Sequence, residues 1–237
     1  MKPLVYGADT QKKIEQANMV IRVDALRLAY MAVPKCASST VKRALAELDP
    51  DVDTENLIAP SDHSSSRWHK VYPTSRFRPH RWETVPDEWF GFTVVRDPLD
   101  RLLACYTNRV VERRELHNSP KLRDGIIDLP KDPDADFFFQ NLQAYREASS
   151  VVKHHSMHIW LFTGPKLEKF KRVYTVEALS KLQDDLADWI QTPVHFHREN
   201  TSSVPLTADD LSGDTHEALS DWLQQEYDFL SDFYARP

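Results

Sequence analysis

One strand–loop–helix segment, residues 26–48, constrains the fold of this 237-residue chain more than any other. Residues 26–33 are mostly apolar and rich in branched and aromatic side chains, which predicts a buried strand. Pro34 ends that strand, and a loop of small and hydroxyl residues follows it. Apolar residues then recur at helical spacing over 41–48. We therefore expect a strand, a tight loop and a helix in immediate succession.

The start of the expected helix is a candidate anion site. Ser38 or Ser39 is placed to cap the helix, whose first backbone N–H groups and positive dipole end favour phosphate or sulfate oxygens. Lys35 adds a positive charge, and the hydroxyls of Ser38, Ser39 and Thr40 add donors. The alternative is an ordinary strand-to-helix turn beside a surface lysine.

A second junction of the same kind lies further along the chain. Residues 90–95 are another apolar run that predicts a buried strand. Asp97 suits a helix N-cap and Pro98 suits the first helical position. If the two strands are parallel neighbours, Lys35 and Arg96 lie at the same sheet edge, where open α/β sheets bind ligands. Two such junctions would suit a ligand with two separated anionic groups.

The segment 63–82 is basic, with five cations, no acid and interleaved aromatic residues, although the whole chain carries a net charge of −6. Such a segment predicts an anionic ligand nearby. We favour a small anionic molecule or a sugar, bound by Arg67, Lys70, Arg76 and Arg78. A single-stranded nucleic-acid platform uses the same residue types, and a solvated loop is a third interpretation. The net negative charge disfavours general nucleic-acid binding.

The remainder of the chain alternates between helical and strand patterns. Helices are expected over 132–149, 151–162, 179–190 and 215–234, with a weak helical segment over 14–23 and a short strand over 173–176. This alternation predicts one α/β domain over residues 1–237, with a central parallel sheet flanked by helices.

Two cysteines do not make a disulfide framework, and neither a signal-peptide core nor a transmembrane run is present in the sequence. The default expectation is a soluble cytoplasmic protein, provided that the chain is complete. The oligomeric state is not determined by these observations.

Two segments, VPKCASSTVKRAL (33–45) and FTVVRDPLDRLLACY (92–106), together resemble the PAPS-dependent sulfotransferases. They are most similar to the carbohydrate sulfotransferase branch, sulfotransferase family 2. The resemblance implies a P-loop-like domain in which the first motif cradles the 5′-phosphosulfate of PAPS and the second binds its 3′-phosphate. It assigns cofactor binding to Lys35, Cys36, Ala37, Ser38, Ser39, Thr40 and Arg96. Arg198, in the polar stretch 195–203, is a further candidate for a cofactor lid.

Two positions depart from the family pattern. Ala37 and Ser38 occupy a loop that usually contains a glycine, so the backbone is expected to approach the phosphate less closely. Ala104 stands where the family places a serine that binds the 3′-phosphate. The loss of one hydrogen bond to a charged group is worth about 1.5–3 kcal/mol. These departures predict weaker PAPS binding on an unchanged fold.

The implied reaction moves a sulfuryl group from PAPS to a hydroxyl of a carbohydrate or related acceptor, with PAP as product and no metal. Lys35 would stabilise the leaving phosphate. His80 is the first candidate for the general base because it precedes the second strand, and His69 is the next. Two alternatives stay open: a catalytically degenerate sulfotransferase fold that only binds anions, and a P-loop kinase-like nucleotide enzyme. The missing G-x-x-x-x-G-K-[ST] motif speaks against the kinase.

Overall fold

The computed structural model describes residues 20–55, 66–72, 82–197 and 206–236. These residues form two compact units. The sheet unit contains the residues up to Val95 together with Trp160–Asn200, and the helical unit contains Arg96–Ile159 and Thr201–Pro237. The expectation of a single domain over the whole chain stays a prediction.

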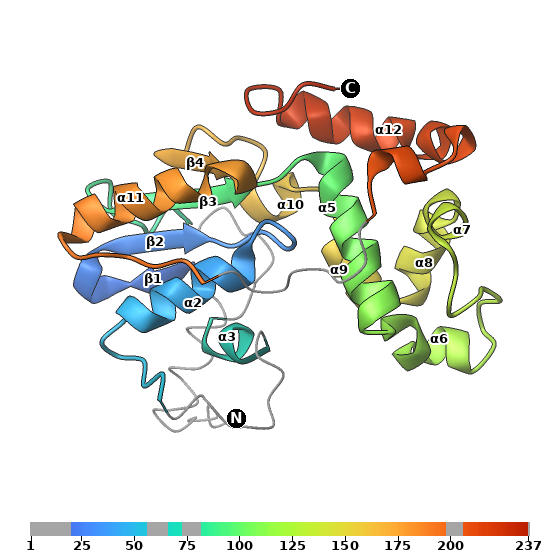
Figure 1. Ribbon diagram of the computed structural model, residues 1–237, viewed down its shortest axis with the longest axis horizontal. Helices are drawn as coiled ribbons and strands as arrows, with labels where there is room; N and C mark the ends of the chain where they lie inside the picture. Colours follow the sequence, from blue (N-terminus) through green and yellow to red (C-terminus); the bar gives the residue numbers. More distant parts are fainter. Residues whose placement is uncertain (1–19, 56–65, 73–81, 198–205, 237) are drawn as a thin grey trace, which may run out of the picture. The chain divides into compact units, whose positions relative to one another are not determined.

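The sheet unit is built on a four-stranded sheet with the order β1-β2-β3-β4 (Figure 1). Its strands are β1 (Ile21–Val23), β2 (Leu28–Met31), β3 (Phe90–Val95) and β4 (Arg172–Thr175). β2, β3 and β4 are parallel, as expected, whereas β1 is antiparallel to β2, so the sheet is mixed. The three strands predicted from apolar runs are therefore confirmed.

β1 corrects part of the weak helical expectation for 14–23, of which residues 14–19 lie outside the described residues. A short 3-10 turn, Asp24–Leu26, and a left-handed Arg27 fold the chain back so that β1 pairs with β2. Ile21 and Val23 are buried on either side of a half-buried Arg22. This two-residue alternation is too short to outweigh a helical pattern in the sequence, and pairing with β2 decides the conformation.

The two faces of the sheet are covered differently. On one face, Tyr30 stacks on Phe92 at 4.8 Å between ring centroids, and Phe90 contacts Trp189 of α11 (Leu179–Ile190) at 5.7 Å. On the other face, Trp82 packs at Gly91, where an added Cβ would lie 2.9 Å from the indole ring. Gly91 is thus needed for close packing of a bulky aromatic ring against β3.

Three helices complete the described part of the sheet unit besides α11, which was predicted over 179–190 and is confirmed. They are α2 (Ser38–Leu48), α3 (Ser66–Val71) and α10 (Trp160–Thr163). α2 follows β2 after a short loop and packs against α3. Because β2 and β3 are parallel in register, the chain leaves both strands at the same edge of the sheet.

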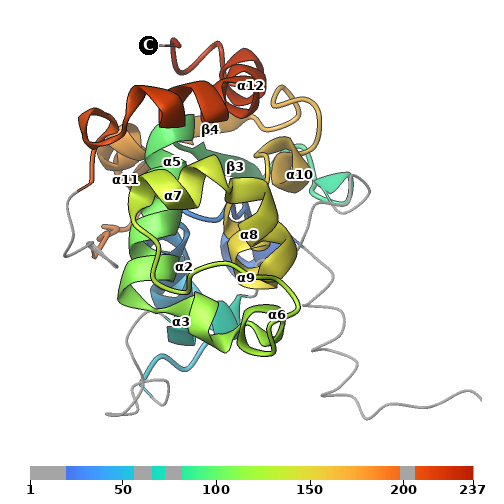
Figure 2. The same cartoon turned by 90° about the vertical axis from the view of Figure 1, so that its right-hand side faces the viewer.

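The helical unit, whose helices are seen in Figure 2, has its own hydrophobic core. Its helices are α5 (Pro98–Cys105), α6 (Pro120–Arg123), α7 (Ala135–Gln140), α8 (Leu142–Ala148), α9 (Ser150–His155) and α12 (Gly213–Phe229). α5 continues into a π-helical segment, Tyr106–Glu112. α12 packs against both α5 and α7.

Two expected helices are interrupted in the structure. The helix predicted over 132–149 is divided at Asn141 into α7 and α8, and that predicted over 151–162 is divided into α9 and α10. Phe138 and Tyr145 are buried in the core, whereas the neighbouring Phe137 is 39% exposed. The division at Asn141 allows α7 and α8 to run in different directions. The apolar residues of this segment follow one continuous helical pattern, so the sequence does not indicate the break.

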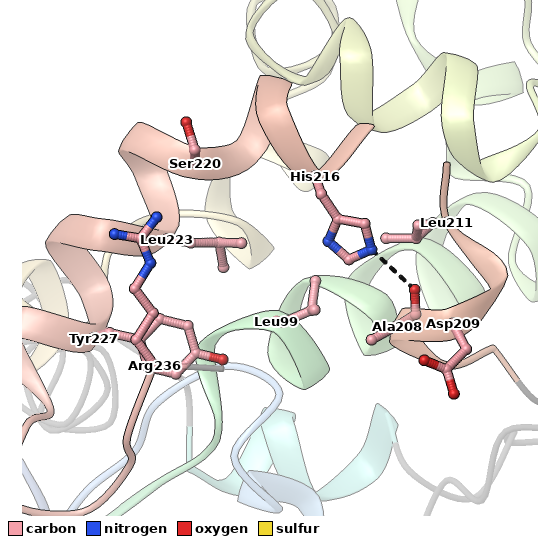
Figure 3. A pocket seen from close by; sticks show the side chains of 9 residues that line it. All are labelled: Leu99, Ala208, Asp209, Leu211, His216, Ser220, Leu223, Tyr227 and Arg236. Carbon is pink, nitrogen blue, oxygen red and sulfur yellow. Dashed lines mark hydrogen bonds between the residues drawn. The ribbon is translucent and has the colours of Figure 1, made fainter. Parts of the chain in front are cut away.

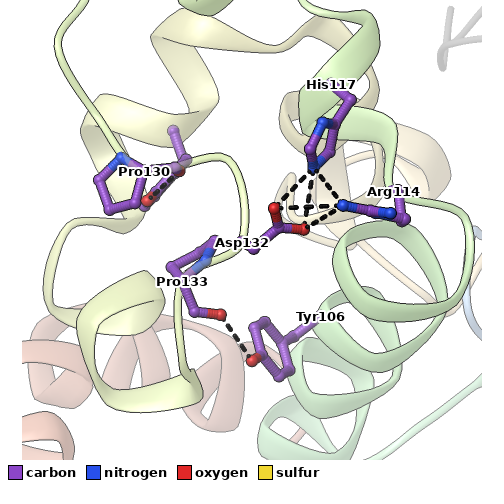
Figure 4. A network of polar contacts seen from close by, with 7 residues as sticks. Tyr106, Arg114, His117, Pro130, Asp132 and Pro133 are labelled. Carbon is purple, nitrogen blue, oxygen red and sulfur yellow. Dashed lines mark hydrogen bonds and ion pairs between the residues drawn. The ribbon is translucent and has the colours of Figure 1, made fainter.

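A polar network holds the loop before α7 in the helical unit (Figure 4). The hydroxyl of Tyr106 donates to the carbonyl of Pro133 at 2.9 Å, and Tyr145 donates to Pro130 at 2.8 Å. Asp132 lies 2.9 Å from His117 Nε2 and 3.2 Å from Arg114. The His117 contact, followed by the Arg114 charge, holds the pKa of Asp132 below its usual value. These exposed ion pairs and buried phenol hydroxyls keep an otherwise irregular loop in place.

Candidate functional site

The loop between β2 and α2 turns through two left-handed residues. Lys35 has a φ of 67° and Ala37 a φ of 51°, and neither is a glycine. Such a conformation costs a non-glycine residue roughly 1–2 kcal/mol and is concentrated at functional sites. The expected cap at Ser38 or Ser39 is wrong, because Ala37 is the N-cap and Ser38 is already helical. The alanine side chain has no hydrogen-bond acceptor, so it does not cap the backbone N–H groups in the first turn of α2.

Burial alternates along the same loop and first turn. Cys36, Ser38 and Thr40 are buried, whereas Lys35, Ala37 and Ser39 are half-buried and reach the surface. Six residues of this loop were assigned to the cofactor, and the three that reach the surface are Lys35, Ala37 and Ser39.

A buried phenol lies near this loop. Tyr30 on β2 is fully buried, and its hydroxyl has no hydrogen-bond partner among the described residues. Burial first, and then the charge of the Cys36 thiolate, raise the pKa of Tyr30 well above its usual value. An unpartnered buried hydroxyl is uncommon in native proteins and is compatible with a site shaped for a polar ligand.

Helices α2 and α3 bring three polar side chains together. His69 Nε2 on α3 lies 3.1 Å from Ser39 Oγ on α2, and His69 Nδ1 lies 3.0 Å from the Lys42 amine. Lys42 is fully buried, and burial lowers its pKa to about 7. Sequence reasoning proposed Ser39 and His69 separately and missed Lys42.

At the second motif, Asp97 caps α5 as expected. Its carboxylate accepts from the backbone N–H of Asp100 at 3.0 Å and from the Tyr227 hydroxyl at 2.9 Å. The Tyr227 phenol consequently has a raised pKa, through burial first and this hydrogen bond second. The guanidinium of Arg96 is 29% exposed and lies 4.0 Å from Asp100. The start of α5 is thus fixed from two sides, with a partly exposed cation beside it.

Arg101, from the same motif, has a structural environment. It is fully buried, lies 3.4 Å from Glu226 of α12, and donates to the carbonyl of Met157. Glu226 also accepts from the backbone N–H of Ile159 at 2.9 Å and lies 3.0 Å from His158 Nδ1. This network joins the second motif to the end of the chain inside the helical unit.

The position that departs from the family pattern has no replacement donor close by on α5. Ala104 is half-buried, and Cys105 behind it is buried. The hydroxyl of Thr107 donates back to the carbonyl of Leu103 at 3.1 Å and is therefore already engaged.

Comparison with known proteins now gives the family. The model of the Sulfotransferase family, in its family 2 branch, matches residues 18–235, which includes most of both units. The chain belongs to the sulfotransferase family. Mouse and human proteins named carbohydrate sulfotransferase 14 are each 27% identical to this chain over 180 residues. The alignment covers 73% of this chain but 46% of theirs, so the chain spans about half the length of these relatives. No solved structure gives a significant match.

The relatives also correct an expectation about location. The cytoplasmic assignment made from the sequence is wrong, because it is contradicted by the similarity to proteins named carbohydrate sulfotransferase 14. None of the helices that the structure describes could span a membrane.

The basic segment 63–82 is described only in part. His69 and Lys70 lie on α3, where Lys70 is exposed, and the backbone of Arg67 belongs to the same helix. The other predicted residues of the site, Arg76, Arg78, His80 and Arg198, lie outside the described residues. The structure therefore brings His69 to the first motif and leaves the other assignments as predictions.

The helical unit contains a cavity of about 570 Å³ (Figure 3). Leu99, Leu211 and Leu223 give it apolar walls, and His216 Nε2 at its edge lies 3.1 Å from the carbonyl of Ala208. None of the residues assigned to the site from the sequence lines it. Among the described residues, no group of three or more His, Cys, Asp or Glu side chains is placed to hold a metal ion.

Proposed function

We propose that this protein is a PAPS-dependent sulfotransferase that transfers the sulfuryl group to a carbohydrate hydroxyl. Membership of the sulfotransferase family and similarity to carbohydrate sulfotransferases support the reaction class and the acceptor class. The observation that carries the proposal is the loop that turns through Lys35 and Ala37 into α2 without a side-chain cap. It places a lysine directly before the N-terminus of an 11-residue helix, whose positive dipole end favours an anion.

The residues of this loop fit the anionic end of the donor. Lys35 and Ser39 are half-buried residues that reach the surface, and the first N–H groups of α2 add fixed dipoles. In the proposed complex these groups hold the 5′-phosphosulfate, and Lys35 offsets the negative charge that develops on the leaving phosphate. PAPS, when bound, supplies the activated sulfuryl group. Cys36, Ser38 and Thr40 are buried, and we assign to them the shaping of the loop.

Arg96 is the proposed partner of the 3′-phosphate. Its partly exposed guanidinium at the capped start of α5 supports this role, because a planar cation binds phosphate oxygens in pairs. Arg198 is retained as a candidate lid residue. Lys70, with Arg67, Arg76 and Arg78, is proposed to bind an anionic carbohydrate, and the exposure of Lys70 is compatible with that role.

His80 is the proposed general base. His69, the other candidate, has one ring nitrogen beside Ser39 and the other beside Lys42. An imidazole that is engaged on both sides has no open nitrogen for an acceptor hydroxyl in this conformation. We therefore assign the proton transfer to His80.

The test measures binding first and transfer second. Thermal unfolding is followed with PAP, with AMP and with ATP plus Mg²⁺. A ligand at a hundred times its Kd stabilises the folded state by about 2.7 kcal/mol. We expect a shift with PAP that is lost in Arg96→Ala and Lys35→Ala and kept in Arg123→Ala, whose exposed side chain pairs with Asp124. Radiolabelled PAPS then reports transfer to a panel of glycans, and transfer should be lost in His80→Ala.

A second candidate function is anion binding without transfer, and Ala104 favours it, because no donor near it on α5 replaces the serine of the family. PAP binding without transfer to any glycan would support this alternative. Stabilisation by ATP plus Mg²⁺ but not by PAP would overturn both proposals.

A further inference from the structure

Lys42 is a buried lysine to which neither the family motifs nor the proposed mechanism gives a role. Its side chain is fully excluded from solvent on α2, three residues after Ser39. Placing an ammonium in such a position is costly unless it is hydrogen-bonded. One of its hydrogen bonds joins it to a histidine, with 3.0 Å between the Lys42 amine and His69 Nδ1.

The chemistry of this contact determines the histidine tautomer. A protonated lysine has three donors and no acceptor, so the nitrogen that faces it must accept. His69 Nδ1 is then the unprotonated nitrogen, and Nε2 carries the hydrogen of the neutral ring. Nε2 lies 3.1 Å from Ser39 Oγ and consequently donates to it. The hydroxyl hydrogen of Ser39 is then directed away from His69.

We propose that Lys42 is a positioning residue that acts through His69 to make the Ser39 hydroxyl a hydrogen-bond donor for an anion at the start of α2. The inference rests on the proposed function for the identity of that anion, the 5′-phosphosulfate of the donor. It adds two residues to the site: Lys42, which does not touch the ligand, and His69, which orients a group that does. The full burial of Lys42 supports the arrangement, because a hydrogen bond is electrostatically stronger in a low-dielectric environment than in water.

The first experiment reads the tautomer without any ligand. Nitrogen-15 NMR of labelled histidine at pH 6.5, below the pKa of about 7 that burial gives Lys42, distinguishes the two neutral tautomers and the cation. The His69 signal is assigned by its loss in His69→Gln. We expect the Nε2–H tautomer in the wild type and a changed tautomer population in Lys42→Met. An Nδ1–H tautomer in the wild type would overturn the proposal.

The second experiment is a double-mutant cycle on PAP affinity with Lys42→Met, Ser39→Ala and both together. Lys42→Met should weaken PAP binding about tenfold, the value of one charge-assisted hydrogen bond. It should have almost no effect when Ser39 is already alanine. Lys181→Met is the matched control, because this exposed lysine pairs with Asp185 on α11. Equal weakening in both backgrounds would mean that Lys42 is merely structural, and the proposal would be wrong.

A fold defect in Lys42→Met would be visible as a lower thermal midpoint, and His69→Ala then replaces it in the cycle. Glutamine can accept from Lys42 and donate to Ser39, so His69→Gln should retain more PAP affinity than His69→Ala. Failure of the proposed function looks different: the wild type would then bind no PAP while its histidine tautomer stays as expected. In that case pyrophosphate replaces PAP as the probe, and an affinity that does not depend on Ser39 overturns the role of Lys42.

Discussion

The carboxylate of Glu226 lies 3.4 Å from the guanidinium of Arg101, and neither side chain is exposed to solvent. The two residues are 125 positions apart in the chain. Arg101 belongs to the second sulfotransferase motif, and Glu226 lies near the end of α12. The motif residue therefore stabilises the helical unit, whereas Arg96 is the partly exposed arginine that can meet a ligand.

Breaking this pair from one side should be strongly destabilising. Glu226→Gln leaves the Arg101 charge buried without a carboxylate, and we expect a loss of about 3–5 kcal/mol in the free energy of unfolding, measured with urea. Glu217→Gln, at an exposed position of the same helix, should change it by less than about 0.5 kcal/mol. Replacing both partners by apolar residues, Arg101→Met with Glu226→Leu, should recover most of the loss. Similar values for the single and double variants would contradict the explanation.

The buried lysine should leave a signature in the pH dependence of stability. Burial lowers the pKa of Lys42 from 10.5 to about 7, so between these values the unfolded chain binds a proton that the folded chain lacks. Stability from this group therefore rises with pH, by about 1.4 kcal/mol per pH unit, and is lowest at and below pH 7. Between pH 7.5 and 9.5, the wild type should gain about 2–3 kcal/mol relative to Lys42→Met. Parallel stability curves for the two proteins would exclude a shifted lysine.

The left-handed cap of α2 should tolerate glycine unusually well. Ala37→Gly removes the steric cost of a φ of 51° but adds backbone entropy to the unfolded state, so we expect stability to be unchanged or to rise by up to about 1 kcal/mol. Ala44→Gly, inside the same helix, should instead lower it by at least about 1 kcal/mol. Chemical denaturation of both variants provides the comparison, and an equal loss at the two positions would argue against strain at Ala37.

Restoring the family serine tests the account of the 3′-phosphate. Ala104→Ser should strengthen PAP binding about tenfold or more, because it adds one hydrogen bond to a charged group on the helix that follows Arg96. Ala187→Ser, at a half-buried position of α11, is the matched control and should leave the affinity unchanged. Calorimetric titration measures both variants. If Ala104→Ser binds PAP no better than the wild type does, the 3′-phosphate does not meet this part of α5.

The local elements around the site could be predicted from the sequence. β2, β3 and β4 were identified from their apolar runs, and the cap and first turn of α5 from Asp97 and Pro98. The same signals failed where a local pattern was short or ambiguous. Ser38 or Ser39 was predicted as the cap of α2, but the cap is Ala37. The amino-acid composition of the loop does not show that Ala37 adopts a left-handed conformation and that the helix begins directly after it.

The sequence by itself determined that β2 and β3 are each followed by a helix and that Asp97 caps α5, because hydrophobic period and capping chemistry act over a few neighbouring residues. Tertiary structure alone decided that β1 pairs with β2, that Lys42 meets His69 and that Arg101 meets Glu226. These contacts join separate segments, and their energy comes from burial and hydrogen bonds that exist only once the chain has folded. Lys42 illustrates both contributions. Its position three residues before Leu45 places it on the buried face of α2, which the sequence pattern determines. The histidine that accepts its hydrogen bond comes from another helix, which only the tertiary structure determines.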